Sequence, residues 1–310
     1  NKPPWGAIMR VFITGGSGFV GRALTKELLA NGHEVTILTR SRKGKEDLAE
    51  EVRLVTGDPT QPGSWQDEVL KADTVINLAG ASIFTRWNQA AKDRILTSRV
   101  DTTRNLVDAL ATPLESGQRL LISTSAVGFY GFRGDKKLDE SMPPGDDFLA
   151  VVCREWESEA LKAEDYNVRV VITRFGIVLG PGGGALKRML PIFRFGLGGR
   201  LGKGDQWFSW IHSTDLSRAA SFVIDHTDIS GPVNFTAPEP VTNKGLTEAL
   251  GKALRRPAVL PAPAFLVKQV LGEFGTMLLD GQRVEPRKLQ ASGFEFNFPT
   301  IEQALSDILA

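Results

Sequence analysis

A glycine-rich turn near the start of the chain constrains the fold more than any other segment. An apolar stretch at 10–13, typical of a buried strand, leads into Gly15, Gly18 and Gly21, each separated from the next by two residues. Apolar residues then recur on one helical face over 19–31. Glycines in these positions allow a tight turn and let the helix pack closely against the strand. The sequence therefore predicts a strand–loop–helix unit at the beginning of an α/β sheet.

The rest of the chain repeats this alternation of strands and helices. Strands that are apolar throughout, separated by helices, indicate a mostly parallel sheet covered on both faces. We predict an α/β fold with a doubly wound, Rossmann-type sheet over residues 9–180 and a smaller C-terminal lobe over 181–310, which can interleave with the first part. The later predicted strands are 33–38, 52–55, 74–78, 119–123 and 168–173, and the later helices are 95–110, 245–254, 264–279 and one that begins near residue 300.

The glycine turn also predicts a ligand. Amide groups at the start of a helix face outward, and together with the helix dipole they favour an anionic pyrophosphate. The strand–loop–helix context therefore favours dinucleotide binding over the alternative, a tight turn that holds no ligand. The residues that we expect to contact the cofactor here are Gly15, Ser17, Gly18, Phe19, Val20 and Gly21.

The end of the second predicted strand indicates which dinucleotide is bound. A site for NAD usually has an acidic residue there, which bonds the ribose 2′-hydroxyl. This chain has Arg40, and an arginine can hold a 2′-phosphate through two parallel hydrogen bonds. The residue predicts NADP as the cofactor, with a solvated basic loop as the alternative. Asp58, just past the third strand, is either an adenine contact or a turn residue before Pro59.

Composition excludes several other classes of protein. The chain has 37 Lys and Arg against 36 Asp and Glu, a balance that gives no reason to expect a nucleic acid or a membrane as partner. One cysteine allows no internal disulfide and favours a reducing compartment, the cytoplasm, or a plastid if the source is a plant. Three scattered histidines argue against a metal site. Residues 1–8 precede the first strand, and we expect them to be a non-native or processed leader.

Taken together, the motifs resemble the extended branch of the short-chain dehydrogenase/reductase superfamily. The resemblance extends from Met9 over the whole chain and is strongest to an atypical, sugar-nucleotide-epimerase-like group. Some of its members are described as cell-division-inhibitor-like, and plant members occur in chloroplasts. The motifs that carry the resemblance are Gly15 to Gly21, Asn77-Leu78-Ala79-Gly80, Ser98-Arg99, Ser123-Thr124-Ser125-Ala126-Val127-Gly128-Phe129-Tyr130-Gly131, Arg154-Glu155-Trp156-Glu157, Arg174-Phe175-Gly176, Gly182-Gly183-Gly184 and Trp207-Phe208-Ser209-Trp210.

The resemblance implies roles for residues at the ends of two strands. Leu78, Ala79 and Gly80 would pass beneath the ribose and pyrophosphate of the cofactor, and Ser123 and Thr124 would face the nicotinamide. Ser125 matches the catalytic serine or threonine of typical members, whose hydroxyl bonds the reacting carbonyl or hydroxyl of the substrate. Tyr130 is a second catalytic candidate, with a packing tyrosine as the alternative.

The chain departs from the family at its usual proton donor. Typical members carry Tyr-x-x-x-Lys, but Gly134 follows Tyr130 by four residues and Val170 follows Tyr166. Our alignment puts Leu149 and Cys153 where the tyrosine and lysine belong. A positioned proton donor raises the reaction rate by about 10²–10⁴-fold. Either another group donates the proton in this chain, or the chain does not catalyse the reaction. The candidates are Tyr130, Cys153, Glu155 and His212, although a buried cysteine, a solvent-facing Glu155 and a loop-ordering His212 are the simpler interpretations.

Two functions therefore stay open at this point. One is an NADP-dependent oxidoreductase or nucleotide-sugar epimerase that acts on a small-molecule substrate and lacks the Tyr/Lys pair. The other is a non-catalytic NADP-binding protein with a regulatory or interaction role, in redox sensing or in cell or organelle division. Whether the chain is an enzyme is not fixed by its sequence. By resemblance, the helix over 95–110 is a possible homodimer surface.

Two further segments suggest a substrate pocket between the lobes. Glycines at 180–184 form a turn, and Trp207 and Trp210 flank a short apolar stretch. Paired tryptophans either stack on a ring or sugar face or pack one lobe against the other.

Overall fold

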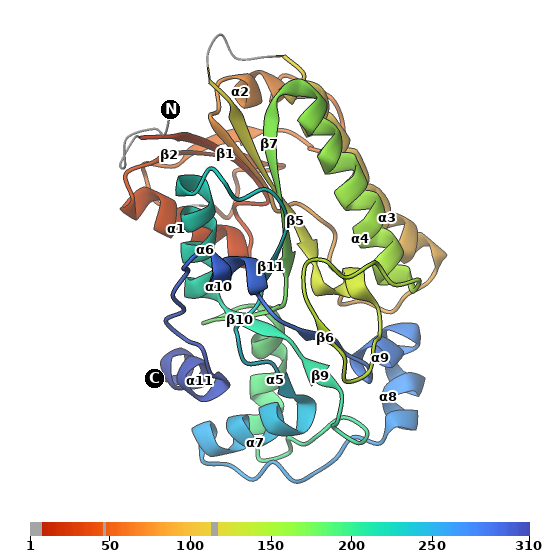
Figure 1. The fold of residues 1–310 in the computed structure, drawn as a ribbon. Helices are drawn as coiled ribbons and strands as arrows, with labels where there is room; N and C mark the ends of the chain where they lie inside the picture. The colour runs from red at the N-terminus through yellow and green to blue at the C-terminus, as the bar shows by residue number, and fades with distance from the viewer. Residues whose placement is uncertain (1–7, 46–47, 113–116) are drawn as a thin grey trace.

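Seven parallel strands form the central sheet, in the order β11-β7-β5-β4-β1-β2-β3 (Figure 1). The computed structural model describes residues 8–45, 48–112 and 117–310, so the predicted leader at 1–8 lies outside the described residues except for Ile8. The strand order runs outward in both directions from β1 and β4, as in a doubly wound sheet. The predicted Rossmann-type fold class is confirmed.

The central-sheet strands are β1 (Arg10–Thr14), β2 (Glu34–Thr39), β3 (Arg53–Thr56), β4 (Thr74–Asn77), β5 (Arg119–Ala126), β7 (Val168–Phe175) and β11 (Gly231–Phe235). Short pairs outside this sheet join β6 (Lys137–Leu138) to β13 (Arg283–Val284), β8 (Ile177–Leu179) to β10 (Trp210–His212), and β9 (Trp207–Phe208) to β12 (Val241–Thr242). The helices are α1 (Phe19–Ala30), α2 (Gln66–Leu70), α3 (Gln89–Leu110), α4 (Phe148–Leu161), α5 (Gly184–Arg194), α6 (Ser213–Asp225), α7 (Asn243–Leu254), α8 (Ala264–Leu271), α9 (Glu273–Leu278), α10 (Arg287–Ala291) and α11 (Ile301–Leu309), with 3-10 turns η1 (Val127–Tyr130) and η2 (Lys162–Tyr166).

Helices cover both faces of the sheet. On one face α1 and α6 bury Leu24, Leu28 and Val223 against the strands, and on the other α3 and α4 bury Leu106 and Ala160 (Figure 1). The strands are therefore apolar on both sides, which explains their unbroken hydrophobic sequences. No helix in the described ranges has both the length and the apolar character needed to cross a bilayer.

The C-terminal part interleaves with the sheet. α6 packs against α1, and β11 pairs with β7 at the edge of the central sheet, although both elements lie beyond the predicted boundary at residue 180. A separate core forms around α5, α7 and α11, where Trp210, Leu246 and Leu305 are buried. The smaller lobe in the lower half of Figure 1 thus lies below the carboxyl ends of the central strands.

Five helices, α2, α4, α5, α6 and α10, were not predicted from the sequence, and two predicted helices have different bounds. α3 begins at Gln89 rather than near residue 95, because the Asn88 side chain accepts a hydrogen bond from the Ala91 amide and caps the helix. The single helix predicted over 264–279 is divided into α8 and α9 by Gly272, whose φ of 63° lies in the left-handed region. Glycine adopts this conformation without a steric penalty, so the chain can turn there.

Candidate functional site

The glycine turn forms a cradle built of backbone. Gly15 has a φ of 71°, and a Cβ there would lie 2.8 Å from the Leu78 carbonyl carbon. A Cβ on Gly21 would lie 2.5 Å from the Gly16 Cα, so the start of α1 packs directly on the turn. Gly18 precedes α1 in an extended conformation, and no side chain caps the helix. The first-turn amides of α1 are thus left to an external acceptor, which fits the pyrophosphate of a dinucleotide.

Other predicted contact residues surround this cradle. The Ser17 carbonyl accepts a hydrogen bond from the Arg22 Nε, which fixes the turn, and Val20 packs against the sheet core. Thr14 donates from its hydroxyl to Asn77 Oδ1 at 2.7 Å and accepts from the Ala79 amide at 3.3 Å. These bonds join the ends of β1 and β4, so the 78–80 loop lies beside Gly15.

The Phe19 ring lies under the second glycine turn. A Cβ on Gly183 would lie 2.0 Å from the Phe19 Cδ2, and one on Gly184 would lie 3.0 Å from its Cε1. These glycines are needed for close packing of the loop onto α1. This contact brings the loop at 180–184 to the cofactor cradle rather than to a substrate pocket between the lobes, which refines the sequence prediction.

Arg40 and Asp58 are exposed at the ends of neighbouring strands, β2 and β3. The Asp58 carboxylate accepts from both the amide and the hydroxyl of Thr60, at 3.0 and 2.8 Å. Those bonds lower the pKa of Asp58, and the nearby Arg40 charge adds to the effect. Asp58 therefore makes the turn that was one of its two interpretations, and its contact with adenine stays a prediction.

Two hydroxyls at the end of β5 lack protein partners. The buried Ser123 Oγ and Thr124 Oγ1 have no hydrogen-bond partner in the described structure. A buried hydroxyl without a partner costs about 1–3 kcal/mol unless a ligand or water satisfies it. The hydroxyls of Thr25, Thr74, Thr102 and Thr236 are unpaired as well, so it is the position of Ser123 and Thr124 that points to the cofactor. Both atoms lie at the carboxyl edge of the sheet, one strand away from β4. This arrangement fits their predicted contact with the cofactor.

Ser125 is hydrogen-bonded to a buried ion pair. Its hydroxyl donates to Glu157 Oε1 at 2.6 Å. Arg174 donates to the same carboxylate through Nε at 2.9 Å and Nη2 at 2.8 Å. The side chains of Arg174 and Glu157 are only 3% and 7% exposed. The Ser125 proton is thereby directed to Glu157, and Ser125 itself is buried, with the Cys153 thiol as a further neighbour.

Tyr130 belongs to the same network and is fully buried. Its hydroxyl donates to Asn234 Oδ1 at 2.6 Å and accepts from Arg174 Nη1 at 3.0 Å. Burial raises the pKa of Tyr130 to about 12. A phenol that is enclosed and engaged in this way cannot readily exchange a proton with a substrate at neutral pH, so its environment favours the packing interpretation over the catalytic one.

Arg99 on α3 lies beside the position of the missing lysine. Its Nη1 donates to the carbonyls of Ile95 and Ala81 at 2.8 and 3.1 Å, and its guanidinium lies 5.1 Å from the Trp156 ring centre. It packs against Gly80, where a Cβ would lie 3.0 Å from Cζ. Burial lowers the Arg99 pKa, and the Cys153 thiol is close enough to offset this in part. No carboxylate pairs with Arg99 among the described residues.

The other proposed substitutes for the proton donor have structural environments. Cys153 is buried, and burial raises its thiol pKa to about 11. Glu155 is exposed and pairs with Arg154. His212 is buried and caps α6 by accepting from the Thr214 amide at 3.1 Å. All three match the simpler interpretations given by the sequence.

Leu149, at the expected position of the tyrosine, joins an apolar cluster. Its neighbours there include Trp87 of the β4–α3 loop and Phe274 and Met277 of α9. Apolar side chains from the sheet domain and the C-terminal lobe therefore meet next to β5. A leucine cannot exchange a proton, so this position contributes packing alone.

Glu157 and Arg99 lie in motifs that carry the family resemblance, but sequence analysis assigned neither of them a role in the site. A signal for Glu157 existed, since Ala150, Cys153, Glu157 and Ala160 recur at helical spacing and all are buried. A carboxylate on such an apolar face needs a cationic partner, here Arg174. Arg99 gave no comparable signal, because its contacts with Ala81, Gly80 and Trp156 come from a loop and from another helix.

The two tryptophans of the lobe have different environments. Trp210 is fully buried and donates to the Glu239 carbonyl at 3.1 Å, so it packs the lobe. Trp207 is half-buried and donates to Asp135 at 2.8 Å, with Arg283 over its ring. Only Trp207 is available for a ligand.

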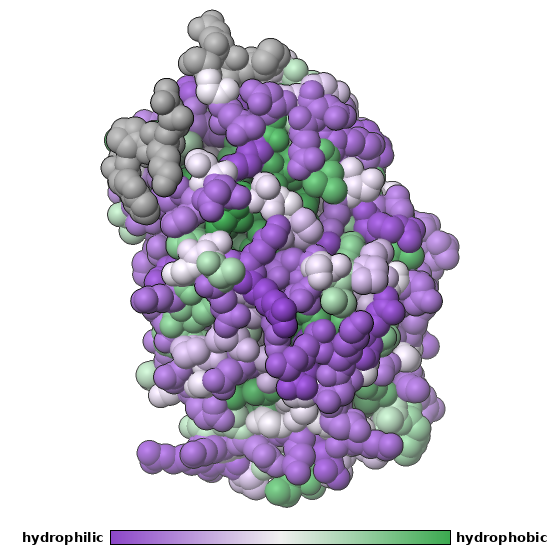
Figure 2. Space-filling model, viewed as in Figure 1, coloured by the Kyte–Doolittle hydropathy of each residue, from purple (hydrophilic) through white to green (hydrophobic). Residues whose placement is uncertain are grey.

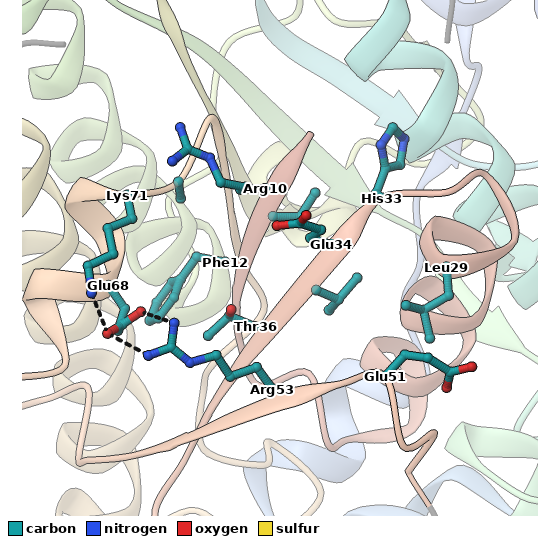
Figure 3. A pocket seen from close by; sticks show the side chains of 13 residues that line it. Arg10, Phe12, Leu29, His33, Glu34, Thr36, Glu51, Arg53, Glu68 and Lys71 are labelled. Carbon is teal, nitrogen blue, oxygen red and sulfur yellow. Dashed lines mark hydrogen bonds and ion pairs between the residues drawn. The ribbon is translucent and has the colours of Figure 1, made fainter. Parts of the chain in front are cut away.

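A shallow pocket lies at the opposite edge of the sheet, at the amino ends of β1, β2 and β3 (Figure 3). Charged side chains line it, and Arg53 and Lys71 both pair with Glu68. Exposed pairs of this kind contribute little to stability. Open α/β sheets bind ligands at the carboxyl ends of their strands, so this pocket is not the predicted cofactor site.

Comparison with known families gives two matches along the chain. Residues 11–235 match the NAD dependent epimerase/dehydratase family, and residues 262–308 match a domain of unknown function, DUF1731. The chain is 41% identical over 302 residues to the Epimerase family protein SDR39U1 homolog, chloroplastic, of Arabidopsis thaliana, covering 97% of this chain and 87% of that protein. It is 38% identical over 303 residues to the Epimerase family protein YfhF of Bacillus subtilis, covering 97% and 98%.

Solved structures agree with the fold. The crystal structure of human epimerase family protein SDR39U1 (isoform2) with NADPH superposes with a TM-score of 0.84 at 35% identity, covering 97% of this chain and 99% of that one. The Thermus thermophilus UDP-glucose 4-epimerase complex with NAD superposes at 0.76 with 21% identity, covering 97% and 98%, a likeness of fold alone.

Proposed function

Because the chain belongs to the NAD dependent epimerase/dehydratase family, we propose that it is an NADP(H)-dependent oxidoreductase or epimerase. Its substrate would be a small or nucleotide-linked carbonyl or hydroxyl compound. The observation that carries the proposal is the convergence, at one edge of the sheet, of a glycine cradle without a side-chain cap and the Ser125 hydroxyl. That a 35% identical structure holds NADPH supports the choice of cofactor.

The cofactor would lie along the carboxyl edge of the sheet. The pyrophosphate would accept from the first-turn amides of α1, beside Gly15 and Gly18. Arg40 would hold the 2′-phosphate, and the unpaired hydroxyls of Ser123 and Thr124 would meet the nicotinamide half. When bound, the nicotinamide supplies a hydride donor or acceptor, and the protein supplies position and charge.

Arg99 would take over the electrostatic task of the missing lysine. It has a positive charge without a carboxylate partner in the described chain, and it contacts Gly80, one of the predicted cofactor residues. A buried cation that donates to backbone carbonyls alone retains capacity for an anion. The positive charge beside the cofactor would then come from Arg99 on α3, whereas the lysine of the family's Tyr-x-x-x-Lys motif would lie on α4.

Ser125 would be the residue that touches the substrate. Since its proton points to Glu157, its oxygen can accept from a substrate hydroxyl, which is the state from which a hydride is removed. The proton released on oxidation could then pass through Ser125 to Glu157. Arg174 holds the carboxylate in position and Tyr130 accepts from Arg174 Nη1, so we call both positioning residues.

Cofactor binding is tested by titrating NADPH and NADH separately by fluorescence. We expect micromolar binding of NADPH and much weaker binding of NADH, with the difference removed in Arg40→Ala. The matched control is Arg42→Ala, because Arg42 lies in the same loop but donates to the Leu54 carbonyl. Absence of binding by either nucleotide would contradict the proposal, and equal effects of both substitutions would contradict the role of Arg40.

Catalysis is tested separately, by following NADPH absorbance with a panel of carbonyl compounds and nucleotide sugars. Ser125→Ala should remove at least about tenfold of any turnover, because a positioned polar group is worth that much or more, while NADPH affinity is retained.

A second function is favoured by the apolar cluster around Leu149. In that case the chain binds NADP(H) without turnover and presents a cofactor-dependent surface to a partner. NADPH binding with no oxidation or reduction across the panel, together with a protein partner captured with NADPH but not with NADP, would favour this function over the first.

A further inference from the structure

Two segments of the C-terminal lobe concentrate positive charge. Residues 184–204 comprise α5 and the loop after it, and residues 249–272 comprise the end of α7, the following loop and α8. Together they carry nine Lys and Arg and no Asp or Glu, although the whole chain has 37 basic and 36 acidic residues. All nine side chains are exposed, and none forms an ion pair within the described part of the chain.

The same two segments expose large apolar side chains. Phe195 is 81% exposed, Val259 76% and Phe265 66%, and Ile192, Leu197 and Val270 are also exposed. Single exposed apolar residues are normal on a protein surface, but a group of this size marks an interaction site.

The two segments form one continuous surface. The Leu260 amide donates to the Gly198 carbonyl at 3.2 Å, and Leu201 pairs with Ala262 in a β-bridge. Gly196 lies against Pro257, and α8 starts directly after the bridge. This surface lies at the lower end of the molecule in Figure 1, where the loop between α7 and α8 forms the tip. In the same region Figure 2 shows hydrophobic side chains beside hydrophilic ones.

We infer that this basic–apolar surface docks the protein on an anionic lipid bilayer. Exposed phenylalanine and aliphatic side chains at the tip would enter the headgroup region, and the surrounding Lys and Arg would attract acidic lipids. Charge complementarity favours an acidic bilayer over a second copy of the chain. If the same surface of two copies met, nine positive charges would face nine positive charges.

The overall charge balance hides this feature. A net charge of +1 gave no reason to expect a membrane partner, but the two segments with the nine basic residues are flanked by the acidic residues Asp205, Glu248 and Glu273, and the rest of the chain is acidic. The surface begins within α5, whose first residue lies against Phe19 of the cofactor cradle. It also includes the start of the segment that matches DUF1731. Docking would thus hold the proposed cofactor site near the membrane.

The experiment is flotation of the full chain with vesicles of phosphatidylcholine alone and of phosphatidylcholine mixed with phosphatidylserine. We expect binding to the acidic vesicles that weakens with added salt. Arg256→Glu should lower vesicle affinity by about tenfold or more, since each Lys or Arg near an acidic surface contributes about fivefold. Phe195→Ser should lower it as well, whereas Lys26→Glu, the same charge change on α1, should leave it unchanged.

Far-UV circular dichroism of each variant verifies folding independently of the vesicle result, and NADPH titration bears on the proposed function alone. Equal binding to both kinds of vesicle, no binding to either, or equal losses in Arg256→Glu and Lys26→Glu would overturn the inference. So would concentration-dependent self-association that Phe195→Ser abolishes, because the surface would then join two copies of the chain.

Discussion

The Glu157–Arg174 pair should be the most costly polar contact in the molecule to break from one side. Glu157→Gln removes a negative charge while preserving shape, and it leaves Arg174 buried with the Tyr130 hydroxyl and the Phe129 ring as neighbours. Arg174→Met leaves the carboxylate buried with Ser125 as its remaining donor. Either change strands a charge in an environment that is almost closed to water.

The expected magnitude follows from this burial. Removing one partner of a buried pair costs about 3–5 kcal/mol of unfolding free energy, whereas replacing both often costs little. We expect each single variant to lose about 3–5 kcal/mol and the double variant to lose at least about 2 kcal/mol less than the sum. Ser125→Ala provides a smaller perturbation, about 1.5–3 kcal/mol, because the carboxylate keeps both bonds from Arg174.

The assay is urea unfolding at pH 8, followed by tryptophan fluorescence and far-UV circular dichroism, for the four members of this double-mutant cycle. Coincident transitions by the two probes are needed before free energies are compared. Arg104→Met is a matched control, because its ion pairs with Asp101 and Glu159 involve a half-exposed guanidinium and should cost below about 1 kcal/mol. Losses that add within about 0.5 kcal/mol would refute the reasoning, since independent sites behave that way.

Four further predictions follow from single positions. Arg99→Met should weaken NADPH binding by about tenfold, the value of one charge-assisted hydrogen bond, and Arg99→Lys should restore part of it; equal affinities in titration would remove Arg99 from the site. Gly183→Ala should lower unfolding free energy by about 1–3 kcal/mol, because its Cβ would lie 2.0 Å from the ring at the start of α1, whereas Gly245→Ala meets ordinary contacts and should not. Burial lowers the His212 pKa below its ordinary value of 6.5, so as the pH falls the unfolded chain takes up a proton before the folded chain does. Urea unfolding should therefore show a loss of stability below about pH 6.5. The same dependence of unfolding free energy on pH in His212→Asn would contradict this. With its pKa raised to about 11, the Cys153 thiol should react with a thiol reagent at neutral pH only as fast as the protein unfolds, and rapid labelling of the folded chain would disprove its burial.

Local patterns in the sequence predicted six of the seven central strands and missed the edge strand β11. The strand β4 is buried along its whole length because helices cover both faces of the sheet, and the glycine turn lies in consecutive residues. The split at Gly272 was missed because the apolar pattern runs through 264–279 without interruption, while the break depends on the backbone conformation of one glycine. Periodicity reports which face is buried and is insensitive to a single left-handed residue.

The centre of the candidate site could not be predicted in the same way. Ser125, Glu157 and Arg174 come from β5, α4 and β7, and their contacts depend on how α4 packs across the two strands. Sequence analysis considered Glu155, which is exposed, because it lies in the same motif as Glu157. A shift of two residues along a helix moves a side chain by about 200°, from solvent to core, so tertiary packing decides between them.

Holding a dinucleotide and protonating a substrate are separable tasks, and this chain treats them differently. The features suited to binding are intact, with a glycine cradle, unpaired hydroxyls on β5 and a cation at Arg99. The sequence contains no Tyr-x-x-x-Lys, and burial raises the pKa of Tyr130 to about 12, while its hydroxyl has two partners inside the protein. Any catalysis would therefore have to pass its proton through Ser125, and oxidation of a substrate hydroxyl is the direction in which the hydrogen bond to Glu157 can accept it. If Ser125→Ala abolishes turnover while NADPH affinity is unchanged, the enzyme proposal is supported; if no substrate oxidation depends on Ser125, the binding features alone are functional, and the second candidate explains them better.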